Sequence, residues 1–199
     1  AICMRIAAVI LAAGLSSRMG ASKPLLPLGD RSLLGHCRAL FAACGLTDML
    51  VVVGHKAEDV GSEARFLGLR VIENPDYRFG MFSSVQKAVS ALPADTDAFF
   101  MLPVDIPLIR PATVRRLLAA FVAGNGVILY PTFAGRRGHP PLIPAVLSQA
   151  ILVHDGTGGL EALLSTYPGR ELAVWDEGIL LDADTTEDLQ ELRERQKRV

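Results

Sequence analysis

The chain has little cysteine and almost no net charge. It contains 3 cysteines in 199 residues, and its formal net charge is -1. Cys3, Cys37 and Cys44 form no close pair, which argues against a disulfide framework and against a zinc site. The simple interpretation is a reducing compartment, so we expect a cytoplasmic protein. A near-neutral chain also lacks the basic footprint of a nucleic-acid-binding protein, and we expect no such partner.

Long apolar runs are missing as well. Residues 6–13, which follow Arg5, could be read as the apolar part of a short signal peptide. The run is too short to span a membrane, and a glycine-rich basic loop follows it directly. We therefore interpret it as a buried first strand and expect no membrane partner. The length favours one domain, residues 1–199, which can bury a full core without disulfides.

Apolar runs of strand length alternate with segments of helical period along the chain. Strands are predicted at residues 5–11, 48–53, 69–73, 97–104, 126–132, 139–143, 171–175 and 179–181. Helices are predicted at residues 32–44, 57–66, 83–92, 111–122, 146–153, 160–165 and 186–196. This alternation predicts a three-layer α/β domain with a doubly wound, mostly parallel sheet, and Trp175 is expected in its core. Ligands of such sheets bind outside the carboxyl ends of the strands, so the site is expected in those loops.

The loop after the first strand combines small residues with two cations. It contains Leu11-Ala12-Ala13-Gly14, then Arg18, then Lys23 followed by proline. Backbone N–H groups in a small-residue loop can form an anion-binding nest, while Arg18 and Lys23 suit phosphate oxygens. The spacing fits neither a Walker loop nor the dinucleotide fingerprint. The alternative is a flexible surface loop with solvated cations.

Two aspartates are candidate metal ligands. Asp105 follows an apolar strand, where a lone carboxylate is costly unless it is paired or bound to a cation. Asp184 and Asp182 lie two residues apart on the expected last strand, so both point to the same side. Magnesium prefers one or two carboxylates together with substrate phosphates. The alternative is that these aspartates only cap helices.

Two further segments carry candidate binding residues. Gly80, Ser83 and Ser84 enter a helix, where N–H groups and hydroxyls could hold part of a nucleotide; an ordinary helix cap at Ser83 is the alternative. Residues Arg136, Arg137 and His139 form a basic loop that could bind an anionic acceptor. A solvated hairpin tip is the alternative for that loop.

Taken together, these motifs resemble those of the nucleotidyltransferases with a glycosyltransferase-A-like fold, and most of all the molybdenum cofactor cytidylyltransferases. The related guanylyltransferases come next. The resemblance runs in order through the segments 11–23, 80–85, 103–108, 135–140 and 181–189. It departs from the family pattern at Leu160, where an arginine is common after the glycine-rich turn at residues 156–159.

The resemblance implies a Rossmann-like nucleotidyltransferase fold and transfer of CMP from CTP to a molybdopterin-type cofactor, with release of pyrophosphate. It implies Mg²⁺ on Asp105 and Asp184, and catalytic roles for Asp105, Arg18 and Lys23. The implied nucleotide-binding residues are Leu11, Ala12, Ala13, Gly14, Arg18, Lys23, Gly80, Ser83 and Ser84. The implied acceptor-binding residues are Arg136, Arg137 and His139.

Two other functions stay open at the level of sequence. One is the same chemistry on another substrate, as in a guanylyltransferase or a sugar- or polyol-phosphate cytidylyltransferase. The other is a non-catalytic nucleotide- or cofactor-binding domain. The joint presence of Arg18, Lys23 and Asp105 speaks against the second.

Overall fold

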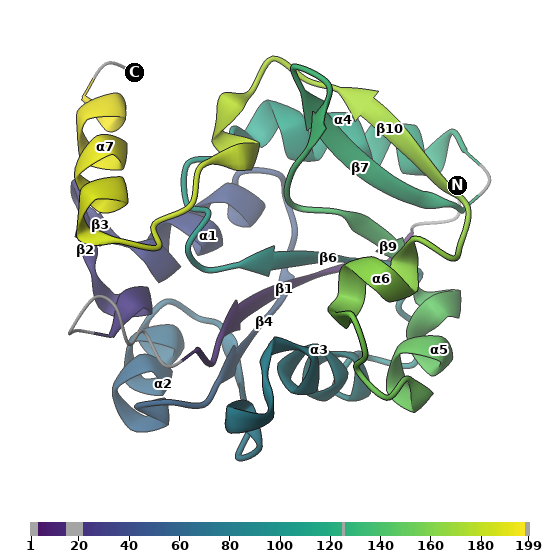
Figure 1. Cartoon of the computed structure of the whole chain (residues 1–199), viewed down its shortest axis with the longest axis horizontal. Coiled ribbons are helices and arrows are strands. Elements are labelled where there is room, and N and C mark those ends of the chain that lie inside the picture. Colours follow the sequence, from purple (N-terminus) through teal and green to yellow (C-terminus); the bar gives the residue numbers. More distant parts are fainter. Residues whose placement is uncertain (1–3, 15–21, 125, 198–199) are drawn as a thin grey trace.

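The computed structural model describes residues 4–14, 22–124 and 126–197, and its centre is one twisted sheet (Figure 1). The sheet order is β10-β7-β9-β6-β1-β4-β5, and β8 pairs with β7. Its strands are β1 (Ile6–Ala12), β4 (Asp48–Val53), β5 (Arg70–Glu73), β6 (Ala98–Pro103), β7 (Ile128–Phe133), β8 (Arg136–Arg137), β9 (Leu142–Pro144) and β10 (Gly169–Ala173). A separate hairpin pairs β2 (Pro27–Leu28) with β3 (Arg31–Ser32).

The strands β5, β4, β1 and β6 run parallel to one another, whereas the rest of the sheet is mixed. β1 lies parallel to both β4 and β6, whereas β9 lies antiparallel to β6 and β7. The predicted α/β class with a mostly parallel sheet is confirmed. β6, the strand that leads to Asp105, is central as predicted, and both of its faces are covered.

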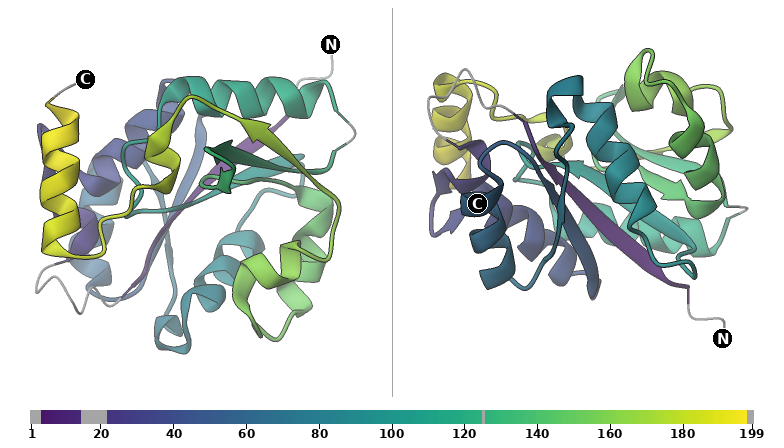
Figure 2. Two further views of the ribbon diagram at one scale, coloured as in Figure 1. Left: turned by 45° about the horizontal axis from the view of Figure 1, so that its top comes forward. Right: turned by 90° about the horizontal axis from the view of Figure 1, so that it is seen from below.

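Helices cover both faces of the sheet (Figure 2). The helices are α1 (Leu33–Ala42), α2 (Ala57–Phe66), α3 (Met81–Ser90), α4 (Pro111–Val122), α5 (Ser148–Val153), α6 (Gly159–Leu164) and α7 (Thr186–Gln196). Alternate residues of β1 belong to two hydrophobic cores. Ile10 belongs to the core that includes buried residues of α1, α2, α4 and α7, and Val9 to the core that includes residues of α3, α5 and α6. No helix in the described ranges is long and apolar enough to cross a membrane.

The predicted boundaries match for the strand at Asp48–Val53 and for α2, α4 and α7. α1 begins one residue later than predicted, because the Ser32 hydroxyl accepts a hydrogen bond from the Gly35 N–H at 3.0 Å and caps the helix. α3 begins earlier, at Met81, with Gly80 as its N-cap. Gly80 has a φ of 102°, a conformation that only glycine adopts without strain.

Two predictions near the C-terminus were wrong. Residues 179–181 are not a strand; the chain forms the 3-10 helix η4 (Glu177–Leu180), because the Asp176 side chain accepts a hydrogen bond from the Gly178 N–H and turns the backbone. The aspartates at 182 and 184 therefore lie in an irregular segment. Trp175 is 92% exposed, not buried, because its neighbour Val174 takes the inward position.

The contact between Phe100 on β6 and Phe41 on α1 offers a test of this packing. Both rings are fully buried, with centroids 5.5 Å apart. We expect Phe100→Ala to lower the free energy of unfolding by about 3–5 kcal/mol, as measured by urea denaturation. Phe66→Ala removes a ring that is 86% exposed and is the control. Equal effects of the two substitutions would contradict the described core.

Candidate functional site

Three predicted residues meet at the carboxyl edge of the central strands. Lys23 Nζ lies 2.8 Å from Asp184 Oδ1 and 3.2 Å from Asp105 Oδ2. The three side chains are 14% (Lys23), 22% (Asp105) and 47% (Asp184) exposed. Asp105 and Asp184 are 82 and 161 positions away from Lys23 in the sequence, yet both bind its ammonium group. A shared cation lowers the repulsion between two carboxylates that lie close together.

Backbone hydrogen bonds bring the segments of these residues into contact. The Val104 N–H donates to the Leu11 carbonyl at 3.0 Å, which holds the end of β6 against the end of β1. The Ala183 N–H donates to the Asp105 carbonyl at 2.9 Å, which brings the neighbouring Asp184 to the same edge. The site is therefore built from the ends of two strands and a later loop.

Neither Asp105 nor Asp184 caps a helix among the residues that the structure describes. The N-cap of α7 is Thr185, whose hydroxyl accepts from the Asp188 N–H while the Asp188 carboxylate accepts from the Thr185 N–H. Asp184 bonds Lys23 instead. The N-cap of α4 is Arg110, so Asp105 does not cap that helix.

Charge and burial shift two pKa values in this cluster. Burial by itself would lower the pKa of Lys23, but its hydrogen bonds to Asp184 and Asp105 and their charges raise it. Lys23 is therefore a cation at neutral pH. Burial, followed by repulsion from Asp184 and Asp105, raises the pKa of Asp182. Asp182 thus lies in the field of the cluster, whereas Asp184 makes the bond to Lys23.

A pocket of about 320 Å³ opens beside this cluster. Of the predicted nucleotide-binding residues, those that line it are Leu11, Ala12, Ala13, Gly14, Lys23, Gly80 and Ser84. Ser83 does not line it, and Arg18 lies outside the described residues. Tyr77 and Arg78 also line the pocket and were missed. Their place just before Gly80 was the available signal.

The serine hydroxyls at the start of α3 are already engaged. Asn74 is 2% exposed, and its Nδ2 donates to the hydroxyl oxygens of Ser83 and Ser84 at 2.9 Å each. The Asp76 N–H donates to Asn74 Oδ1 at 3.0 Å. Asn74 therefore fixes the turn that places Gly80 at the pocket, and it was not among the predicted site residues.

A second pocket of about 380 Å³ adjoins the first and shares Leu11, Met81 and Pro103 with it. Arg137 and His139 line this second pocket, whereas Arg136 does not. Adjacent strand residues point to opposite faces, and this separates the two arginines of β8. Tyr130 and Glu161 also line the pocket and were missed.

The two basic residues of this second pocket differ in charge. Arg137 Nε donates to Glu171 Oε1 at 2.5 Å, and its guanidinium lies 4.4 Å from the centre of the Tyr130 ring. Burial lowers the pKa of His139, so this imidazole is neutral at pH 7. Its Nδ1 is buried without a hydrogen-bond partner among the described residues. The pocket is thus lined by an arginine that is paired with Glu171, by a neutral imidazole and by apolar side chains.

The carboxylates also define what metal chemistry is possible here. In the part of the chain that the structure describes, no group of three or more His, Cys, Asp or Glu side chains could hold a metal ion. Asp105 and Asp184, which both bind the Lys23 ammonium, supply two carboxylates. Such a pair fits a magnesium-type ion that takes its other oxygen ligands from phosphates and water.

Comparison with known proteins shows the family of the chain. Residues 8–172 match the model of the MobA-like NTP transferase domain. The chain is 32% identical over 192 residues to a molybdenum cofactor cytidylyltransferase of Escherichia coli (strain K12), a match that covers 94% of this chain and 95% of that protein.

Two other similar proteins widen the comparison. A nicotine blue oxidoreductase of Paenarthrobacter nicotinovorans is 30% identical over 193 residues, which cover 92% of this chain and 94% of that one. A solved complex of Rv0371c with manganese, from Mycobacterium tuberculosis H37Rv, is 27% identical with a TM-score of 0.80, covering 96% of this chain and 98% of that one. Full-length similarity thus includes proteins named for different reactions, and the site must discriminate between them.

The raised pKa of Asp182 predicts a pH-dependent cost to stability. The folded protein binds this proton more tightly than the unfolded chain, so ionising Asp182 destabilises the fold. That cost is absent below the unfolded pKa, about 3.9, and appears as the pH rises through the folded pKa. We expect Asp182→Asn to raise the free energy of unfolding at pH 7, with a gain that shrinks toward pH 4, in urea titrations.

The control is Asp30→Asn, which removes an exposed carboxylate outside the cluster. A gain for Asp182→Asn that is as large near pH 4 as at pH 7 would contradict the repulsion described here.

Proposed function

Since this chain belongs to the MobA-like NTP transferase family, we propose that it transfers CMP from CTP to a molybdopterin-type cofactor and releases pyrophosphate. The observation that carries the proposal is the Lys23 ammonium between Asp105 and Asp184, at the mouth of the Leu11–Gly14 pocket. Cations and metal-binding carboxylates at one sheet edge are what a polyphosphate requires. The similarity to the Escherichia coli cytidylyltransferase over nearly the whole of both chains supports the choice of substrates.

We assign Mg²⁺ to Asp105 and Asp184. The pair already accommodates one positive group, Lys23, and its oxygen ligands suit a hard cation. A divalent cation held by Asp105 and Asp184 would offset their negative charge and would supply Lewis-acid stabilisation to a bound phosphate. The manganese in the similar Rv0371c structure supports a divalent cation in proteins of this kind.

The other residues of the site have different roles according to their positions. The backbone at residues 11–14 binds the triphosphate, and Lys23, together with Arg18, neutralises the pyrophosphate that leaves. An acceptor phosphate monoester has a second pKa near 6 and is largely dianionic at pH 7. The acceptor therefore needs no general base, and catalysis consists of positioning and charge stabilisation.

The second pocket is assigned to the acceptor. It adjoins the first across Leu11, Met81 and Pro103, so two ligands can meet at the shared wall. Arg137 supplies a cation for an anionic acceptor, and neutral His139 can hydrogen-bond a polar ring. Arg136 is exposed outside this pocket, and we leave it out of the acceptor site.

Pyrophosphate release with a panel of triphosphates and acceptors tests the function. CTP with molybdopterin should give stoichiometric pyrophosphate, whereas GTP or sugar phosphates should give far less. An oxidoreductase, the activity named for the Paenarthrobacter relative, would release no pyrophosphate. A protein that binds CTP but shows no turnover with any acceptor would support the non-catalytic alternative.

The role of Asp105 predicts a separation of binding from turnover. Asp105→Asn keeps the size of the side chain and removes the charge that the metal requires. We expect Mg²⁺-dependent turnover to fall at least about a hundredfold, while CTP binding is partly retained because Lys23 remains. Lys23→Met should weaken both CTP binding and turnover. Steady-state kinetics and calorimetric titration with CTP measure the two effects, and near-normal turnover of folded Asp105→Asn would disprove the metal assignment.

The position of Ala13 in the nucleotide pocket predicts a preference for a pyrimidine base over a purine base. Its side chain is 5% exposed and lines the nucleotide pocket. A methyl group at this point leaves less room for a purine than glycine would. We expect Ala13→Gly to narrow the ratio of kcat/KM between CTP and GTP, mainly through improved use of GTP. An unchanged ratio in the variant would show that Ala13 does not set this selectivity.

A further inference from the structure

A buried carboxylate that the proposed reaction does not use joins the segment that carries Asp184 to the segment that carries Asp105. Asp176 is 2% exposed, and it is the one ionisable side chain among the buried polar residues of the described ranges. An ionised carboxylate at such a depth is costly unless hydrogen bonds compensate for its lost hydration. Its partners therefore indicate what the fold gains from it.

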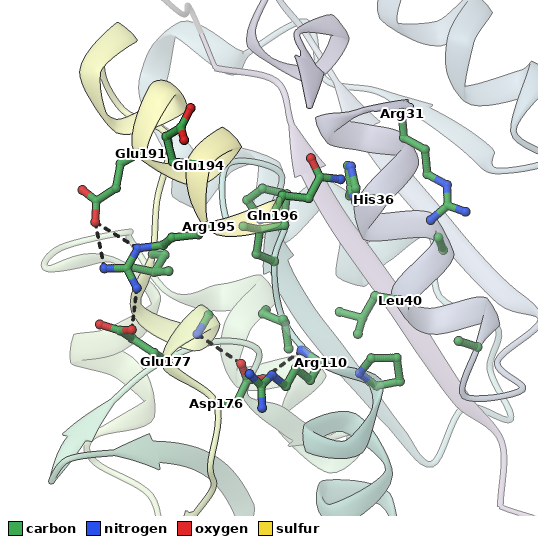
Figure 3. Close-up of a pocket in the computed structure, with 18 residues that line it drawn as sticks. Arg31, His36, Leu40, Arg110, Asp176, Glu177, Glu191, Glu194, Arg195 and Gln196 are labelled. Carbon is green, nitrogen blue, oxygen red and sulfur yellow. Dashed lines mark hydrogen bonds and ion pairs between the residues drawn. The ribbon is translucent and has the colours of Figure 1, made fainter. Parts of the chain in front are cut away.

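Asp176 accepts three hydrogen bonds from two parts of the chain. Its Oδ2 accepts from the Arg110 N–H at 2.8 Å and from the Thr113 hydroxyl at 2.6 Å, both at the start of α4. Its Oδ1 accepts from the Gly178 N–H at 3.1 Å, within its own segment. Figure 3 shows Asp176 and Arg110 facing each other at the edge of a cavity of about 820 Å³ between α1 and α7.

Each of the two joined segments carries one of the aspartates that we assign to the metal. The chain runs from Asp105 through Leu108 to Arg110 on one side, and from Asp176 through Gly178 to Asp184 on the other. At Gly178 the two backbones lie so close that a Cβ atom would stand 2.1 Å from the Leu108 carbonyl oxygen. The Ala183 N–H then donates to the Asp105 carbonyl at 2.9 Å. Contact between the segments thus begins at Asp176 and ends at the carboxylate pair.

The neighbouring Glu177 is a carboxylate of a different kind, because it forms an exposed ion pair. Arg195 of α7 binds Glu177 and Glu191, but the Arg195 and Glu177 side chains are 36% and 49% exposed (Figure 3). Exposed ion pairs contribute little, whereas breaking a buried charged hydrogen-bond group is costly. Of the two adjacent carboxylates, Asp176 is therefore the one that can fix the geometry.

We propose that Asp176, through Thr113 and the Arg110 N–H, is a positioning residue that sets the spacing of Asp105 and Asp184 for the divalent cation. The proposal rests on the proposed function, because it takes these two aspartates as metal ligands. Asp176 touches neither substrate nor metal in this scheme. Its role is to hold the loop that carries Asp184 against the strand end that carries Asp105.

The test removes one hydrogen bond at a time and measures metal binding without turnover. Thr113→Val deletes the hydroxyl and keeps the shape of the side chain, whereas Thr113→Ser keeps the hydroxyl. We expect the dissociation constant for Mn²⁺, measured by electron paramagnetic resonance with CTP present, to rise about tenfold or more in Thr113→Val and in Asp176→Asn. Thr113→Ser should stay within about threefold of the wild type, and hydrogen exchange of the Ala183 amide should quicken in Thr113→Val.

Two controls separate positioning from lost stability. Val114→Ala opens a cavity in the same helix without touching Asp176, so it should lower the free energy of unfolding but leave Mn²⁺ binding unchanged. Glu177→Gln removes the adjacent exposed carboxylate and should change neither quantity much. If Asp176→Asn is too unstable, the two Thr113 variants still decide the question.

The outcomes are distinct. Normal Mn²⁺ binding and Ala183 exchange in folded Thr113→Val, or equal weakening in Val114→Ala, would overturn the positioning role. A wild-type protein that binds no Mn²⁺ in the presence of CTP would contradict the metal assignment on which both proposals rest. Weakened Mn²⁺ binding in Thr113→Val but no pyrophosphate release by the wild type would support the positioning role and refute the transferase proposal.

Discussion

The site depends on one electrostatic contact, the Lys23 ammonium between Asp105 and Asp184. Two carboxylates at one edge of a sheet repel each other, and a cation between them removes that repulsion. The attraction between Lys23 and Asp184 therefore holds the loop that carries Asp184 against the end of the central strand. Under the proposed function, the same two carboxylates would hold the divalent cation, and Lys23 would lie close to the phosphates.

Buried polar side chains hold the loops that the sheet brings together. Asn74 fixes the turn before α3 through two serine hydroxyls, and Asp176 joins the start of α4 to the segment that leads to Asp184. The Thr185–Asp188 capping box begins α7, so Asp184 itself is not required as a cap. Each of these groups satisfies backbone or hydroxyl partners that would otherwise be buried at a cost. The strands are held by backbone hydrogen bonds and apolar packing, whereas the loops that form the site are held by these specific side-chain hydrogen bonds.

Local sequence pattern was informative where one physical rule dominated. Period-two and period-3.6 patterns gave the central strands and the long helices, because a buried face repeats with the geometry of its element. The pattern failed at residues 179–181 and at Trp175. In the first case a hydrogen bond from Gly178 to Asp176 turns an apolar segment away from strand geometry. In the second, an aromatic residue after an edge strand takes the outward position while Val174 takes the inward one.

The sequence by itself determined the fold class and the residue types of the site, because hydrophobic period, glycine-rich turns and charged residues at strand ends are local properties. It could not show that Asp184, not Asp182, bonds Lys23, or that Arg137 and His139 share a pocket from which Arg136 is absent. It also gave no sign of the role of Asn74 or Asp176. Those assignments depend on which chain segments meet across the edge of the sheet, and side-chain direction at such meetings is set by tertiary contacts between residues far apart in the chain.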